Sequence, residues 1–292
     1  MYLLTYDPVN CSEENRKNVE GVGAIYQRVV SLMAISKKIG IPYLHQKFNI
    51  GHNDVGIDNN LYDDLWYNYF NIKVKELTEK EKKEYKPIYI YVLTPQITNK
   101  LIENKNKKFL VYIKNPYLII NMNPNIFYSE IQDEICLLYN EANKNRPLIY
   151  KKDKINIAIH IRVFNNLDDK CEKNNYNTAN NTARFYLKYD FYINLIENLK
   201  KKYDNSEIHI FSQEEYFDTM FKQIREIEDI NLHLTMDNFT TFHHLAKADV
   251  LVLGLSSFSH LAGLYNKKEV YYIYYEYHKK ALNKWFQIYF DK

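Results

Sequence analysis

The alternation of short apolar segments with helical patterns predicts an α/β protein built on parallel sheets. In the second half, this alternation is that of a doubly wound sheet, with apolar segments at 155–161, 207–211, 231–235, 250–253 and 269–275. The first half opens with a strand at 2–6, a glycine loop and a helix over 24–39, which is the start of another parallel layer. A polar stretch with one proline, 143–154, separates the halves. We therefore expect two Rossmann-like domains, 1–148 and 149–292.

The remaining elements follow from the same periodicities. In the first half, strands are expected at 43–48, 88–94 and 109–113, a solvated helical face at 73–86 and a helix over 126–143. In the second half, helices are expected at 185–203, 215–226, 240–247, 257–266 and 277–290. Residues 165–183 are rich in Asn and Asp and are expected to form a long loop.

Composition excludes several classes of function. The 292 residues are 46% hydrophobic and 26% charged with a net charge of +3, and the basic residues are interspersed with acidic ones, so we expect no nucleic-acid partner. Three scattered cysteines do not make a disulfide framework or a zinc site, and they favour a reducing compartment. With neither a signal peptide nor a transmembrane segment in the sequence, we expect a cytoplasmic protein.

The segment 155–162, Ile-Asn-Ile-Ala-Ile-His-Ile-Arg, is the most informative part of the chain. His160 and Arg162 are two residues apart at the end of a strand, so their side chains point the same way. A guanidinium stays charged and matches the geometry of a phosphate, which makes this pair suited to a diphosphate. The alternative to diphosphate binding is that the Arg162 side chain is only solvated and that His160 forms its hydrogen bonds with neighbouring residues.

A second segment complements the first. Residues 248–262 run from an apolar strand into Ser256, Ser257 and Phe258 and then into a helical pattern. Serines at the start of a helix cap free N–H groups, and the same groups make an anion site. In a doubly wound sheet this point lies at the carboxyl ends of the strands, where ligands bind. Plain capping is the alternative.

A glycine loop, Gly21-Val22-Gly23, precedes the first helical pattern. It lacks the third glycine of a dinucleotide fingerprint, which argues against a Rossmann NAD site. Gly21 and Gly23 are therefore expected either to let a ligand approach the backbone closely or to form an ordinary turn.

The order of these motifs resembles the superfamily of α1,2-, α1,6- and protein O-fucosyltransferases. Gly21–Gly40 is similar to its glycine loop and helix, Ile157–Arg162 to its His-x-Arg-Arg-x-Asp motif, and Ile208–Glu215 to its strand ending in Ser/Thr-Asp-Asp. The last segment, His243–Ala262, is similar to its closing motif.

The resemblance implies a GT-B fold, in which two Rossmann-like domains face a cleft and the second holds the donor. It implies an inverting, metal-independent glycosyltransferase that moves fucose from GDP-fucose to a glycan hydroxyl, with no cofactor. The sequence contains no Asp-x-Asp pair of the kind that holds a divalent ion against a diphosphate.

Site residues carried over by position belong to both halves of the chain. Arg162 would stabilise the leaving diphosphate. The loop that follows it offers Asp168, Asp169 and Glu172 as candidate general bases, and the alternative is that these carboxylates are only solvated. The donor-binding set implied by the resemblance and the glycine loop is His160, Arg162, Gly21, Gly23, Ser212, Asp237, Ser256, Ser257 and Phe258. The first domain would supply the acceptor side, where the aromatic cluster at 66–70 either stacks on sugars or forms core.

Two departures from the superfamily pattern leave other readings open. Val163 and Asn165 stand where the motif has its second arginine and its aspartate, and Gln213 and Glu214 replace the Asp pair. The alternatives are a transferase for another nucleotide sugar such as rhamnose, a nucleotide-sugar-binding module without turnover, and a structural α/β protein.

Overall fold

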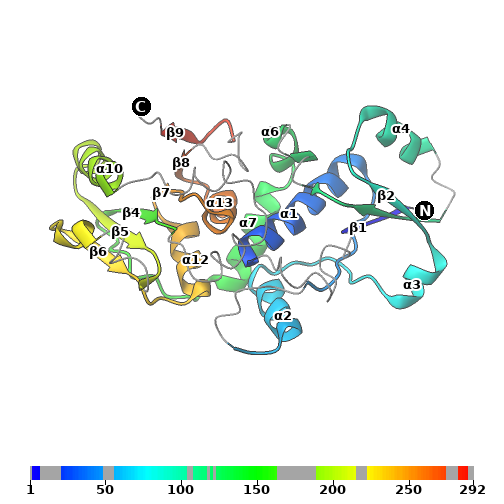
Figure 1. Ribbon diagram of the computed structural model, residues 1–292, viewed down its shortest axis with the longest axis horizontal. Helices are drawn as coiled ribbons and strands as arrows, with labels where there is room; N and C mark the ends of the chain where they lie inside the picture. Colours follow the sequence, from blue (N-terminus) through cyan, green and yellow to red (C-terminus); the bar gives the residue numbers. More distant parts are fainter. Residues whose placement is uncertain are drawn as a thin grey trace, which may run out of the picture. The chain divides into compact units, whose positions relative to one another are not determined.

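Two parallel sheets organise the chain in the computed structural model (Figure 1). The structure describes residues 2–6, 21–48, 56–103, 108–116, 119–120, 123–162, 189–214, 222–273 and 282–288. The chain divides into two compact units, Met1–Lys144 and Asn145–Lys292. This division lies within the polar stretch at 143–154, four residues before the expected boundary after residue 148.

The first unit contains a three-stranded parallel sheet in the order β1-β3-β2. Its elements are β1 (Tyr2–Tyr6), α1 (Val22–Ile39), α2 (Asn59–Tyr69), α3 (Glu79–Glu84), β2 (Lys86–Ile90), α4 (Pro95–Glu103), β3 (Phe109–Ile113), α6 (Pro124–Tyr128) and α7 (Gln132–Asn143). Helix α1 ends at Gly40, whose left-handed φ of 67° suits a residue without Cβ, and the Gly40 N–H donates to the Ser36 carbonyl.

Two expectations for the first unit were wrong. The segment at 43–48 makes only isolated bridges, Leu4 with Tyr43 and His45 with Glu76, so it flanks the sheet without becoming a strand. The helix expected over 126–143 is two helices, α6 and α7, because the chain turns at 129–131 between them. Proline stands at the first position of α6, where its missing N–H costs nothing.

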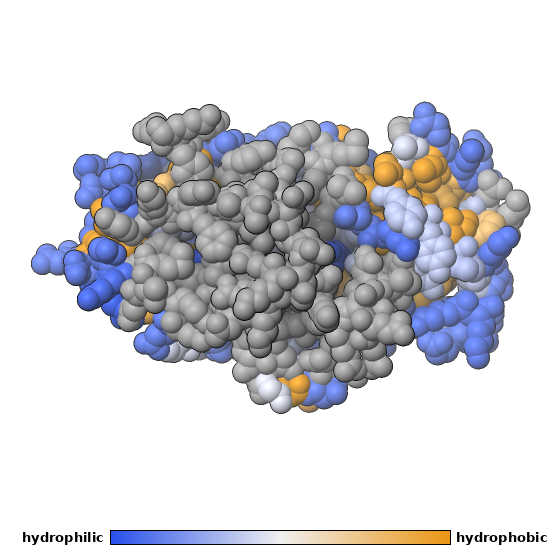
Figure 2. Space-filling view, in the orientation of Figure 1, coloured by the Kyte–Doolittle hydropathy of each residue, from blue (hydrophilic) through white to orange (hydrophobic). Residues whose placement is uncertain are grey.

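The aromatic cluster at 66–70 is core. Trp66 and Phe70 are fully buried and their rings stack, while Tyr69 packs edge-on against both. These three rings therefore cannot stack on a sugar. Exposed aromatic surface lies instead at the end of β2, where Tyr89 and Tyr91 are 49% and 62% exposed. Figure 2 shows apolar side chains gathered over this part of the first unit on the face drawn.

The second unit contains a six-stranded sheet in which every pairing is parallel, in the order β6-β5-β4-β7-β8-β9. Its elements are β4 (Ile155–His160), α10 (Tyr189–Lys202), β5 (Ser206–Phe211), the short 3₁₀ helix η3 (Lys222–Glu226), β6 (Ile230–His233), α12 (Asn238–Lys247), β7 (Val250–Val252), α13 (Ser257–Tyr265), β8 (Glu269–Ile273) and β9 (Phe286–Ile288).

The closing helix expected over 277–290 was wrong. Phe286–Ile288 is strand β9, which pairs in parallel with β8 in the register Tyr271 with Phe286 and Ile273 with Ile288. The backbone hydrogen bonds offered by the edge of β8 outweigh the local helical pattern, since tertiary context overrides propensity. Residues 274–281 and 289–292 lie outside the described residues.

The two faces of the second sheet differ in chemistry. Ile157, Ile159 and Ile161 pack into a hydrophobic cluster with residues of α10. The alternate positions of β4 and β5 face the other way, toward α12 (Figure 1), and include Asn156, His160 and His209. One face is therefore an aliphatic core, and the other carries buried polar side chains among apolar ones such as Ala158 and Phe211.

Among the described residues, none of the helices combines the length and the apolar character that crossing a bilayer requires.

Candidate functional site

The carboxyl edge of the second sheet is the place where this fold can bind a ligand. In chain order β4 to β9, the strand order is 3-2-1-4-5-6, that of a dinucleotide-binding sheet. From β4 the chain adds β5 and β6 on one side of the sheet, and from β7 it adds β8 and β9 on the other side. The point where the strand order reverses, the topological switch point, therefore lies between the paired strands β4 and β7. Crevices at such points bind ligands because the connections leave in opposite directions.

His160 is the last residue of β4 and lies at this switch point. Its side chain is buried, with 8% exposure, and its Nδ1 atom has no hydrogen-bond partner among the residues that the structure describes. Its ring lies 5.9 Å from that of Phe258 on α13. Burial, and secondarily the nearby Arg162 charge, lowers the pKa of His160 to about 3. The imidazole is therefore neutral at neutral pH and carries one N–H donor and one acceptor.

Gly254, on the turn after β7, makes room for this histidine. A Cβ at position 254 would lie 2.4 Å from the His160 carbonyl oxygen and 2.8 Å from its Nδ1 atom. The close approach of the two strand ends therefore requires glycine, although the sequence singles out only the serines that follow.

Helix α13 begins directly beyond Gly254. The Ser256 hydroxyl is the N-cap and accepts a hydrogen bond from the Phe258 N–H at 3.2 Å. Buried Ser259 accepts from the Gly254 N–H at 3.1 Å and so fixes the turn. The Ser257 hydroxyl makes no hydrogen bond within the described part of the chain. The positive end of the helix dipole and the free N–H groups of the first turn favour an anion here.

Arg162 lies on the β5 side of the same edge. Its Nη1 atom donates to Oε1 of Gln213 at 2.9 Å. The Ser212 hydroxyl donates to the Ile161 carbonyl oxygen at 2.8 Å, so it joins the ends of β4 and β5. Ser212 was predicted as a donor contact, and its hydroxyl is committed to this backbone bond.

Asp237 follows β6 and caps α12, because its carboxylate accepts from the Thr240 N–H at 3.0 Å. Its place in the donor-binding set stays a prediction. Gly21 and Gly23 belong to the first unit, where Gly21 is the N-cap of α1 with an extended backbone that any residue adopts. Asp168 and Asp169 lie outside the described residues.

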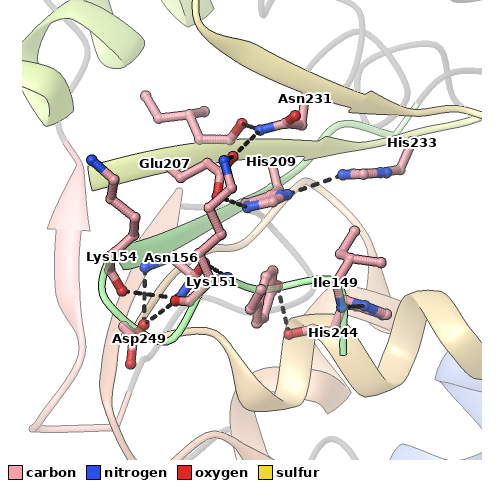
Figure 3. Close-up of polar contacts among 12 residues, drawn as sticks. Ile149, Lys151, Lys154, Asn156, Glu207, His209, Asn231, His233, His244 and Asp249 are labelled. Carbon is pink, nitrogen blue, oxygen red and sulfur yellow. Dashed lines mark hydrogen bonds and ion pairs between the residues drawn. The ribbon is translucent and has the colours of Figure 1, made fainter. Parts of the chain in front are cut away.

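A buried polar network stabilises the sheet below this edge (Figure 3). Asp249 Oδ2 accepts from the backbone N–H and the side-chain amide of Asn156, at 2.9 and 3.1 Å, and thereby ties the start of β7 to that of β4. Nδ1 of His209 and Nε2 of His233 share a hydrogen bond of 3.1 Å. Nε2 of His244 accepts from the Ile149 N–H at 3.1 Å. The Asp249–Asn156 contact holds β7 to β4 in the register that brings His160 beside Gly254, and the two histidine contacts tie β5 to β6 and α12 to the segment before β4.

Gly254→Ala is expected to lower the free energy of unfolding by about 1–3 kcal/mol, because the added methyl meets backbone that cannot move without separating β4 from β7. Urea unfolding measures the loss. Gly263→Ala is the matched control, since the three atoms nearest to its methyl would belong to the side chains of Trp285 and Leu253, at 3.0–3.2 Å, and not to the backbone. Equal stability of the Gly254→Ala variant and the parent would show that the two strand ends are not packed as described.

Among the described residues, no group of three or more His, Cys, Asp or Glu is arranged to hold a metal ion. The site as described consists of a guanidinium, a neutral imidazole, a helix N-terminus and hydroxyls. These groups donate hydrogen bonds to anionic oxygens.

Comparison with known proteins identifies the fold. No protein-family model matches the chain, and no curated protein matches it either. The structure is similar to two crystal forms of POFUT1, a protein O-fucosyltransferase, each in complex with GDP-fucose. Each similarity spans 98% of this chain and 97% of the other at 11% identity, with TM-scores of 0.50 and 0.51.

The chain has the GT-B fold. The resemblance first noted in the motifs is thereby confirmed for the architecture, and its two Rossmann-like parts correspond to the two parallel sheets. At 11% identity the comparison shows the fold only, and it assigns no role to any individual residue. The roles of the site residues rest on the geometry given above.

Proposed function

We propose that this GT-B protein is a fucosyltransferase-like glycosyltransferase that takes its sugar from a nucleotide diphosphate, with GDP-fucose as the first candidate donor. The observation that carries the proposal is the buried His160 Nδ1 atom, unpartnered among the described residues, at the switch point of a Rossmann-type sheet. The POFUT1 structures of the same fold contain GDP-fucose, which supports this donor class.

In the proposed reaction, the donor diphosphate lies at the carboxyl edge of β4 and β7. The first turn of α13 and the Ser257 hydroxyl donate to its oxygens, and neutral His160 adds one hydrogen bond. As the bond from the anomeric carbon to the diphosphate oxygen breaks, negative charge grows on the leaving group, and the Arg162 guanidinium stabilises that charge.

The acceptor hydroxyl attacks the anomeric carbon from the opposite face, which inverts its configuration, while a general base removes the hydroxyl proton. Asp168 and Asp169 remain the proposed candidates for this base. We propose no metal, because the guanidinium and the helix N-terminus supply positive charge to the diphosphate. The glycan acceptor and the cytoplasmic location stay predictions.

A panel of donors tests the proposal. We expect GDP and GDP-fucose to raise the melting temperature by several degrees, since a ligand at 100 times its Kd stabilises the folded state by about 2.7 kcal/mol. UDP and dTDP sugars serve as controls for the base, and release of free GDP from GDP-fucose reports turnover. No response to any nucleotide would contradict the proposal and favour a structural α/β protein.

Other outcomes of the same panel identify the alternatives. A response to GDP with hydrolysis of a different GDP sugar, such as GDP-rhamnose, would assign another sugar. Binding without hydrolysis or transfer to any glycan would assign a non-catalytic nucleotide-sugar-binding module, which Val163 in place of the second motif arginine makes a real alternative.

A further inference from the structure

We propose that Gln213 is a positioning residue that holds the Arg162 guanidinium at the anion site without adding negative charge to it. The inference rests on the proposed function and goes beyond it, because it gives a role to the glutamine that stands where the superfamily motif has its first aspartate. It begins from the hydrogen bond of 2.9 Å between Arg162 Nη1 and Gln213 Oε1.

The backbone around this pair is ordered by a series of hydrogen bonds across three strand ends. Beyond β4 and β5, the Ile161 N–H donates to the Phe211 carbonyl at 3.0 Å, and the Ser212 hydroxyl donates back to the Ile161 carbonyl at 2.8 Å. The Ser212 N–H donates to the His233 carbonyl at the end of β6, at 3.2 Å. Gln213 therefore extends from a fixed backbone, and its amide oxygen is one of the contacts that position the guanidinium.

The chemistry of the amide matters as much as its position. An amide oxygen and a carboxylate oxygen accept the same hydrogen bond from a guanidinium, but a carboxylate also offsets its charge. A carboxylate at position 213 would compete with the phosphate oxygens for Arg162 and repel them as well. A glutamine positions the arginine and adds no charge of its own.

The isosteric change Gln213→Glu tests this distinction. The variant keeps the shape and the acceptor, so the contact with Arg162 becomes an ion pair, and the melting temperature should stay the same or rise. Binding of inorganic pyrophosphate and of GDP should weaken about five- to tenfold at low salt. The loss should shrink in high salt, because screening weakens charge interactions at a partly exposed site. A purely structural role would move stability and affinity in the same direction.

Two further variants complete the design. Gln213→Met keeps the length of the side chain but has no oxygen, so it should weaken binding by a smaller factor and without the dependence on salt. Gln223→Glu makes the same change of charge on the exposed surface of η3, the short helix that packs against α10, and should leave the affinity unchanged. If Gln223→Glu and Gln213→Glu weakened ligand binding equally, the change in net charge alone would explain the loss of affinity, and the inference would be overturned.

The two probes separate this inference from the proposed function. If the parent protein binds pyrophosphate but no nucleotide, and Gln213→Glu weakens that binding, the inference stands and the proposed function falls. If GDP binds the parent and Gln213→Glu equally well, the inference falls and the proposed function stands. A parent protein that binds neither probe would contradict both.

Discussion

Arg162→Ala is expected to reduce the turnover of the donor by a factor of about 10²–10³, which is the cost of removing one preorganised donor from a developing charge. GDP binding should weaken about 10- to 100-fold, because a hydrogen bond to a charged group contributes about 1.5–3 kcal/mol. Isothermal titration with GDP and release of GDP from GDP-fucose measure the two effects.

Controls separate this loss from unfolding. Arg162 is half-buried and its contact with Gln213 is partly exposed, so the alanine variant should fold with nearly the parent's stability. Arg162→Lys keeps the charge but loses the planar fork, and should fall between the parent and the alanine variant. Turnover by Arg162→Ala within threefold of the parent would remove Arg162 from the proposed mechanism.

Mild acid is expected to destabilise the protein well before its carboxylates are protonated. Burial lowers the pKa of His160 to about 3 and those of His209 and His233 to about 4, and for His209 the neighbouring His233 adds to the effect. Each value lies below the ordinary 6.5, so the unfolded chain binds more protons than the folded one. The contribution of these histidines to the free energy of unfolding is therefore fully present above about pH 6.5 and is lost as the pH drops toward 4.

Urea unfolding at intervals between pH 7.5 and 4.5 measures this dependence. Each such histidine can contribute a slope of up to about 1.4 kcal/mol per pH unit. The half-buried carboxylate of Asp249 does not contribute in this window, since its pKa lies below the ordinary value and its stabilisation is lost only at lower pH. His233→Gln, whose amide can keep the bond to His209, should flatten the profile. A stability that is level or rising as the pH falls from 7 to 5 would contradict the account.

Five strands of the second sheet, β4 to β8, were predictable because each was recognised as a short apolar run between turn residues. The expected strand at 155–161 is β4, and the run before Ser256 is β7. Their adjacency was also implied, because a doubly wound pattern brings the carboxyl ends of its strands to one edge. The placement of His160 beside the start of α13 follows from that topology.

Other parts of the site depend on pairings that no local pattern encodes. Gln213 meets Arg162 because His160 is in register with Phe211, and this register is a property of the β4–β5 pair. Gly254 is required by its distance to His160, which lies 94 positions earlier in the chain. The same reason explains the missed strand β9, whose partner β8 supplies the hydrogen bonds that a local helical pattern does not anticipate.

A crystal structure with GDP would locate the proposed nucleotide diphosphate site at the carboxyl edge of β4 and β7. We expect diphosphate oxygens within hydrogen-bond distance of the first turn of α13 and of the Arg162 guanidinium. GDP bound elsewhere on the protein, with this edge of the sheet unchanged, would contradict this expectation.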